Sequence, residues 1–141
     1  MNYEPANHEK MVRIRQEKVD RIADRLPPTE IFGEDSGDIL VIGWGGTFGS
    51  IHAAAKSMQN SGRKVSAVHL RYINPLPNDL EEIMSRFKRV VIPELNLGQL
   101  SRIIRDRYLV DAIPINKVQG RPFLVGELIE RIEQAVAEKN G

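Results

Sequence analysis

The chain has 141 residues, of which 41% are hydrophobic and 28% are charged, and its 20 basic and 19 acidic residues leave a net charge of +1. This composition is typical of one soluble domain, and it lacks the positive excess that nucleic acid or an anionic membrane surface would require. Because the chain contains no cysteine, it forms no disulfide and provides no thiolate for a metal or an iron–sulfur cluster.

The sequence carries no recognisable targeting or membrane-spanning segment. Residues 1–9 contain acidic side chains and no apolar core, which excludes a secretory signal or a transit peptide. The longest run without a formal charge, residues 39–55, is interrupted by four glycines and is too short to span a bilayer. We therefore expect a cytoplasmic protein that does not bind membranes.

Residues 5–26 predict a long, exposed helix. They are densely charged, yet they keep apolar residues at spacings that place them on one side of a helix. Pro27 and Pro28 end this pattern, and residues 31–37 form a connection that closes on a Ser-Gly-Asp turn. The expected organisation is an N-terminal charged helix and linker over residues 1–37, followed by a compact domain over residues 38–141.

From residue 38 onward, short apolar runs alternate with helical patterns. Four buried strands are expected near residues 39–42, 65–70, 90–92 and 113–115. Amphipathic helices follow each strand, which predicts right-handed crossovers and a mostly parallel sheet covered on both faces. Pro114 removes a ladder donor and indicates an edge strand or a bulge. Asn78 and Glu81 have the spacing of a capping box for the third helix.

A glycine-rich turn follows the first predicted strand and contains Gly43, Gly45, Gly46, Thr47 and Gly49. A turn at this position is where backbone amides and a helix N-terminus can hold a phosphate. Gly43 and Gly45 fit the dinucleotide fingerprint G-x-G-x-x-G, but its third glycine position is occupied by Phe48. Two interpretations remain open: a nucleotide or phosphate site, and a tight turn with close packing, which explains the glycines more simply.

Polar residues also follow the third predicted strand, at Glu94, Asn96, Gly98 and Gln99. They lie at the carboxyl end of a parallel strand, where open α/β sheets place their ligands. Alternatively, Asn96 caps the next helix, Gly98 permits close backbone approach, and Glu94 binds loop amides. The sequence does not separate these two roles.

The loop after the second strand is stiffened by prolines and carries Arg71 and Asn74 to the same edge of the sheet. These two residues complete the set of candidate binding or interface residues. The sequence contains no nucleophile motif, so it provides no candidate catalytic residue. The three histidines have no partner at helical spacing, which argues against a zinc site.

Taken together, the glycine turn and the motifs "LRYINPLP", "VVIPELNLGQL" and "VQGRPFLVGEL", in this order, resemble the C-terminal domain of the alpha subunit of 2-oxoacid:ferredoxin oxidoreductases. The 2-oxoglutarate enzymes look closest, and the resemblance covers nearly the whole chain. The transketolase C-terminal domain is a more distant relative. The resemblance implies a three-layer α/β/α domain with a mixed, five-stranded sheet, whose fifth strand would lie near Ile31 and Phe32 or in the C-terminal tail.

The resemblance also implies a reaction, in which a 2-oxoacid and coenzyme A give acyl-CoA and carbon dioxide while ferredoxin is reduced. Thiamine diphosphate, Mg²⁺ and iron–sulfur clusters would perform it in the full complex. This chain has no cysteine, and Gly37-Asp38-Ile39 departs from the G-D-G…N diphosphate motif. We therefore expect it to bind none of these cofactors.

The leading hypothesis is accordingly an accessory domain that is inactive alone. It would contact the remaining domains of the alpha subunit and the beta subunit, with ferredoxin as a partner of the full complex and a homodimer as a further possibility. The alternative hypothesis is a small-molecule module that holds a nucleotide or phosphate in the turn from Gly43 to Gly49.

Overall fold

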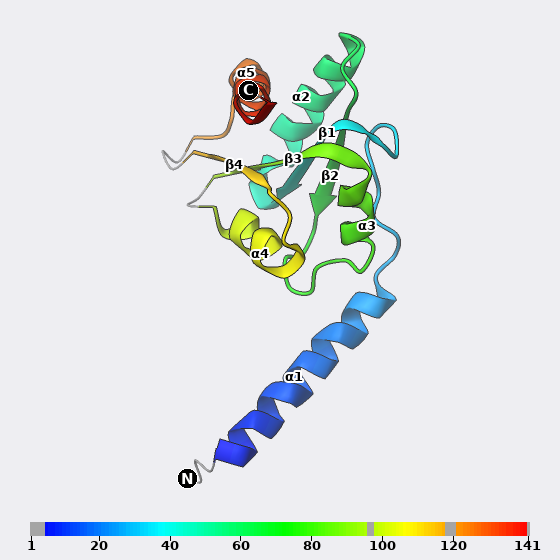
Figure 1. Cartoon of the computed structure of the whole chain (residues 1–141), viewed down its shortest axis with the longest axis vertical. Helices are drawn as coiled ribbons and strands as arrows, with labels where there is room; N and C mark the ends of the chain where they lie inside the picture. Colours follow the sequence, from blue (N-terminus) through cyan, green and yellow to red (C-terminus); the bar gives the residue numbers. More distant parts are fainter. Residues whose placement is uncertain (1–4, 96–97, 118–120, 141) are drawn as a thin grey trace.

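A central sheet of four parallel strands organises the fold, and a long helix leads into it (Figure 1). The computed structural model describes residues 5–95, 98–117 and 121–140. In chain order, the elements are α1 (Pro5–Arg25), β1 (Gly37–Trp44), the 3₁₀ turn η1 (Gly45–Thr47), α2 (Phe48–Asn60), β2 (Val65–Leu70), α3 (Leu80–Ser85), β3 (Phe87–Glu94), α4 (Gln99–Tyr108), β4 (Ile113–Asn116) and α5 (Val125–Asn140).

The strands lie in the order β2-β1-β3-β4, with every neighbouring pair parallel. The two central strands are buried between helices over most of their length, and these buried stretches are nearly continuous apolar runs. Pro114 pairs with Ile92 on β4, the strand at one edge of the sheet. Of the two positions predicted for Pro114, an edge strand or a bulge, the structure shows the edge strand.

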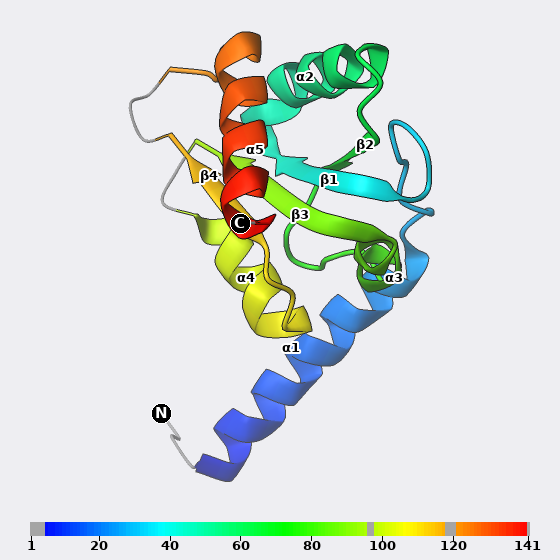
Figure 2. The same cartoon turned by 45° about the horizontal axis from the view of Figure 1, so that its top comes forward.

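Helices cover both faces of the sheet and give it three layers, as expected (Figures 1 and 2). Ile39 and Val41 of β1 point into a core shared with α2 and α5. Leu40 and Ile42 point into a second core, which α3 and α4 close from the other side. This alternation along one strand is the source of the two separate cores.

The described part of the sheet has four strands rather than the five that the family resemblance implied. The segment at Phe32 forms a single antiparallel bridge with Ala67 of β2, in which each backbone amide donates to the other residue's carbonyl, at 2.8 and 3.0 Å. Gly33 then has a positive φ of 123°, which interrupts the extended backbone after this bridge. The C-terminal tail is the helix α5.

Helix α1 projects away from the rest of the molecule (Figures 1 and 2). It spans nearly the predicted range, but its apolar residues find little cover, since Met11, Val12 and Ile22 are each about half exposed. Near its end, Ala23 is buried and Asp24 accepts a hydrogen bond from the Asn78 side chain. None of the helices in the described ranges combines the length and apolar character that a bilayer crossing needs.

The predicted capping box at Asn78 and Glu81 is wrong. Helix α3 begins after Asp79, and no side chain caps its first turn. The Asp79 carboxylate instead accepts hydrogen bonds from the Thr29 hydroxyl, at 2.6 Å, and the Thr29 amide, at 2.8 Å. Asn78 binds Asp24. The N-terminal segment therefore binds the side chains of Asn78 and Asp79, the two residues directly before α3.

Replacing Gly43 by alanine should destabilise the fold. A methyl group at this buried position would overlap Ile51 Cδ1 and would lie 2.9 Å from Thr47 Oγ1. Overpacking of this kind costs about 1–3 kcal/mol, measured as a loss of unfolding free energy in urea. Gly46→Ala is the matched control, because nothing lies within 4 Å of the added atom. Equal stability of Gly43→Ala and wild type would contradict this packing.

Candidate functional site

All four strands end at one edge of the sheet, which we call the carboxyl edge. The last strand residues are Trp44, Leu70, Glu94 and Asn116. The described candidate residues from the sequence analysis lie in the last two residues of these strands or in the segments directly after them. The structure thus brings these residues to one edge, although it assigns them different roles.

Glu94 is a buried carboxylate, with 1% of its surface exposed. Its Oε1 accepts a hydrogen bond from the Trp44 indole N–H at 2.9 Å and from the Leu100 amide at 2.6 Å, and its Oε2 accepts one from the Ser101 amide at 3.3 Å. Two of these donors are the otherwise unpaired first amides of α4, where a negative charge is also favoured by the helix dipole. Glu94 therefore binds backbone amides at the start of α4. This is the structural role, rather than the ligand-binding role, of the two that the sequence left open.

Gly98 permits the tight start of α4. Its backbone is left-handed, with φ = 86°, and an added Cβ would lie 3.0 Å from Ser101 Oγ and 3.2 Å from Asn116 Nδ2. The close approach expected of this glycine is therefore present. Gln99 follows as the exposed first residue of α4. The proposed cap at Asn96 lies outside the described residues.

Arg71 and Asn74 are exposed and lie apart from Glu94. They follow β2, while Glu94 ends β3, and β1 lies between these two strands. Trp44 of β1 pairs with Leu70 on one side and donates its indole N–H to Glu94 on the other. The structure therefore places these residues on one edge without joining them into one cluster.

The glycine turn is only partly explained by packing inside this chain. Gly43 packs against Ile51, and Gly45 has a left-handed backbone with φ = 64°. The Thr47 hydroxyl is buried and donates to the Trp44 carbonyl at 3.0 Å. Nothing lies within 4 Å of a Cβ built on Gly46 or Gly49. These two glycines leave bare backbone on the surface at the start of α2.

Phe48 occupies the place where a dinucleotide fingerprint requires its third glycine. Its ring is 55% exposed and packs edge-on against His69, with ring centroids 5.0 Å apart. A large apolar ring at the first residue of α2 covers the approach that a pyrophosphate would need. The geometry thus disfavours the nucleotide interpretation of this turn.

A pocket beside Phe48 escaped the sequence analysis. Its volume is about 260 Å³, and its lining includes Glu30, Phe32, Phe48, His52 and His69. The Phe32 and His52 rings lie 3.9 Å apart between centroids. Burial, and then the nearby Arg71 charge, lower the pKa of His69, whose Nδ1 has no partner in the described structure. The pocket forms where residues 30–32, 48–52 and 67–69 meet, and the bridge between Phe32 and β2 brings the first of these segments to it. No local sequence motif therefore predicts the pocket.

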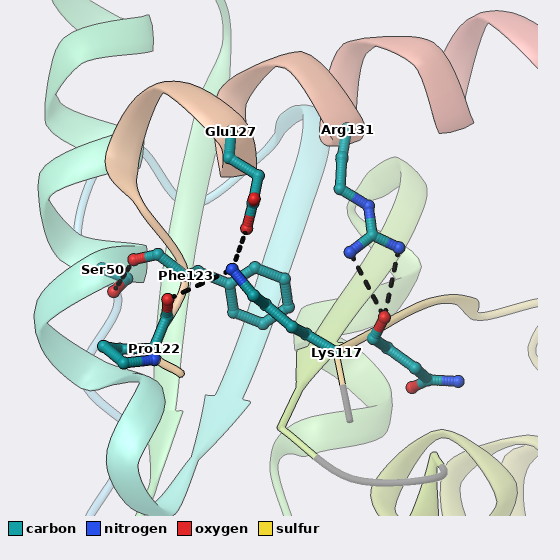
Figure 3. A network of polar contacts seen from close by, with 7 residues as sticks. Ser50, Lys117, Pro122, Phe123, Glu127 and Arg131 are labelled. Atoms are coloured by element: carbon teal, nitrogen blue, oxygen red, sulfur yellow. Dashed lines mark hydrogen bonds and ion pairs between the residues drawn. The ribbon is translucent and has the colours of Figure 1, made fainter. Parts of the chain in front are cut away.

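A polar network holds residues 122–123, just before α5, in place (Figure 3). The Lys117 ammonium binds Glu127 Oε1 at 2.7 Å, and the Arg131 guanidinium donates two hydrogen bonds of 3.2 Å to the Asn116 carbonyl. Both cations lie 5.8 Å from the centroid of the Phe123 ring. The Ser50 hydroxyl of α2 donates to the Phe123 carbonyl at 2.8 Å, which ties this loop to the start of α2.

Exposed apolar side chains gather in the loops of the carboxyl edge. We use the name carboxyl-edge rim for Phe48, Tyr72, Leu95, Leu124 and Val125, which come from all four loops and the helix starts after them. Phe48, Tyr72 and Leu124 are 55–69% exposed. In the described part of the α/β domain, Leu109 is the one other large apolar residue of this exposure. Such a distribution is typical of a surface that contacts another polypeptide.

Two observations on the described residues bear on the cofactors that the family resemblance implies. The described residues contain no group of three His, Asp or Glu side chains arranged to hold a metal ion. Gly37 and Asp38, the start of a possible diphosphate motif, lie at the opposite edge of the sheet. There, Asp38 pairs with Lys88 at 3.3 Å and with Arg63 at 3.9 Å.

Comparison with known proteins gives a consistent result. Residues 37–137 match the family described as pyruvate:ferredoxin oxidoreductase core domain II. The chain is 45% identical over 139 residues to 2-oxoglutarate oxidoreductase subunit KorA of Mycobacterium tuberculosis, a match that covers 97% of this chain and 21% of that protein. It is 32% identical over 147 residues to the alpha subunit of 2-oxoacid:ferredoxin oxidoreductase 1 of Aeropyrum pernix, covering 98% and 22%, respectively.

Solved structures agree with these sequence matches. The 2-oxoglutarate:ferredoxin oxidoreductase of Magnetococcus marinus superposes with a TM-score of 0.84 and 33% identity, over 96% of this chain and 24% of that one. A split-gene transketolase superposes with a TM-score of 0.61 at 17% identity, over 78% and 41%, which shows a shared fold. The chain thus spans about one fifth of the curated relatives' length.

Removing the Glu94 carboxylate should destabilise the carboxyl edge. Glu94→Ala leaves the Trp44 indole and two helix amides without their acceptor, which should lower the unfolding free energy by about 2–4 kcal/mol. Glu94→Gln keeps one acceptor oxygen, and it should lower the unfolding free energy by about 1–2 kcal/mol. Denaturant titrations followed by the fluorescence of Trp44, the single tryptophan, measure both.

Glu82→Gln is the control for this measurement. It makes the same chemical change on a side chain that is 78% exposed, and it should alter stability by less than about 0.5 kcal/mol. A Glu94→Gln protein as stable as this control would contradict the role given to the buried carboxylate.

Proposed function

The chain belongs to the pyruvate:ferredoxin oxidoreductase core domain II family, and on this premise we propose that it serves as an accessory, assembly-forming domain of the alpha subunit of a 2-oxoacid:ferredoxin oxidoreductase. The observation that carries this proposal is the 45% identity to KorA over almost the whole of this chain. The same match covers about one fifth of KorA, so the domain performs only part of the work of such an enzyme.

The reaction proposed for the complete enzyme converts a 2-oxoacid and coenzyme A into acyl-CoA and carbon dioxide, and reduces ferredoxin. 2-Oxoglutarate is the favoured substrate, since the Magnetococcus relative was solved with 2-oxoglutarate, coenzyme A and succinyl-CoA. Thiamine diphosphate, Mg²⁺ and iron–sulfur clusters would perform the bond cleavage and electron transfer. Without cysteine, this chain contributes no thiolate ligand to a cluster, so the iron–sulfur clusters would be held by other polypeptide segments.

The domain would contribute through the carboxyl-edge rim. Burying Phe48, Tyr72 and Leu124 against another surface removes apolar area from water, which favours association. The bare backbone at Gly46 and Gly49 lets that surface approach closely. The partners would be the remaining domains of the alpha subunit and the beta subunit, in a cytoplasmic complex that uses ferredoxin and permits a homodimer.

The candidate residues divide into two groups under this proposal. Glu94 and Gly98 would hold the edge in shape from inside, while the exposed Arg71, Asn74 and Gln99 would make polar contacts at the interface. Residues 1–37 would form a connecting arm, and residues 38–141 the docking domain. This division follows the difference in burial between these side chains.

A chimeric subunit tests the proposal. Residues 1–141 would replace the matching segment of Mycobacterium tuberculosis KorA, co-expressed with the other subunits of that enzyme. The chimera should assemble and reduce a viologen acceptor with 2-oxoglutarate and coenzyme A, while the isolated chain should give no turnover. Substituting serine for both Phe48 and Leu124 should lower the assembled fraction about tenfold, equivalent to ~1.4 kcal/mol.

Leu109→Ser is the matched control, because Leu109 is 90% exposed and lies after the far end of α4. It should leave assembly unchanged. A chimera that folds but does not assemble would refute the accessory role, and turnover by the isolated chain would refute the claim that it is inactive alone.

A further inference from the structure

The pocket beside α2 is bounded by a continuous row of aromatic rings. The centroids of Phe32 and His52 are 3.9 Å apart, those of His52 and Phe48 are 5.7 Å apart, and those of Phe48 and His69 are 5.0 Å apart. Each of the four residues lines the pocket. Phe48 also belongs to the carboxyl-edge rim, so the pocket opens where the proposed interface begins.

Charge at the pocket favours a cation. Glu30 is exposed, it lines the pocket, and it is the one carboxylate among the lining residues. No lysine or arginine is among the residues that line it. Burial, and then the positive charge of Arg71 outside the lining, lower the pKa of His69, so this side chain stays toward its neutral form. The faces of aromatic rings carry partial negative charge, which adds to the attraction of the carboxylate.

The size and shape of the pocket restrict the cation further. Its volume of about 260 Å³ falls below the range of roughly 300–1,000 Å³ that is usual for cofactor-sized ligands. A single long side chain fits such a space. A guanidinium is flat, stacks on aromatic faces and forms a two-pronged hydrogen bond with a carboxylate, whereas an ammonium ion does neither as well.

We propose that this pocket is a socket for an arginine side chain presented by a partner polypeptide, with the guanidinium stacked on Phe48 and His52 and paired with Glu30. Arginine is among the residue types that most often anchor protein interfaces from within pockets. The proposal adds an anchor to the assembly role proposed above, and it rests on that role only for the identity of the partner.

Titration of the chain with Nα-acetyl-L-arginine amide tests the socket directly. The resonances of the Phe32, Phe48 and His52 ring protons should shift in a saturable way in NMR spectra. Nα-acetyl-L-citrulline amide has the same shape without the charge, and it should bind at least about fivefold more weakly, as should the arginine probe to Glu30→Gln. Glu34→Gln is the matched control, because Glu34 is exposed and lies outside this pocket.

Equal binding of the arginine and citrulline probes, or shifts confined to other parts of the chain, would overturn the socket. Phe48→Leu tests stacking separately from charge, because it removes an aromatic ring and no charge. It should lower the affinity for the arginine probe, and the fold should stay intact because position 48 is exposed. The chain could bind the arginine probe while the Glu30→Gln chimera still assembles as well as the unmodified chimera. That result would overturn the claim that a partner polypeptide occupies the pocket. Failure of the chimera itself would count against the proposed function and not against the socket.

Discussion

The carboxylate of Glu94 sits where three elements of the fold meet. It ends β3, accepts the indole N–H of Trp44 from β1, and accepts the first amides of α4. A buried carboxylate is costly unless its oxygens are paired, and here every bond it makes links one element to another. The position of the loop between β3 and α4, and with it this part of the carboxyl edge, depends on these bonds.

The carboxyl edge combines a rigid interior with an apolar exterior. Glu94 and Gly98 fix one half of the edge, and the network around Lys117, Arg131 and Phe123 fixes the other half. The side chains of the carboxyl-edge rim project from this frame and are 37–69% exposed. A pre-ordered apolar surface loses little entropy when it docks, which suits the assembly role proposed above.

Much of the fold follows from the sequence because its signals are local. The apolar runs at Ile39–Ile42 and Val65–Leu70 predict buried strands, and Pro114 identifies an edge strand, since each depends on neighbouring residues alone. The capping box at Asn78 failed because Thr29 and Asp24, about fifty residues away in sequence, supply the partners of that segment. The expected fifth strand is reduced to one bridge, which Gly33 ends.

The same contrast between local signals and long-range contacts applies to the candidate site. Sequence placed Arg71, Glu94 and Gly98 at one edge, because parallel strands share their carboxyl ends. The sequence did not show whether Glu94 binds a ligand or has a structural role. Its hydrogen bond with Trp44 joins two neighbouring strands whose residues are 50 positions apart in the sequence. The pocket of Phe32, Phe48, His52 and His69 was missed, because three separate segments have to meet before it exists.

In the assembly role proposed above, the carboxyl edge is the face that docks. Hydroxyl-radical footprinting compares the free chain with the same chain assembled in a KorA chimera. Phe48, Tyr72 and Leu124 should be labelled more slowly on assembly, and Leu109 at the opposite end of α4 should be labelled at an unchanged rate. Protection of Leu109 with no change at the carboxyl-edge rim would contradict it.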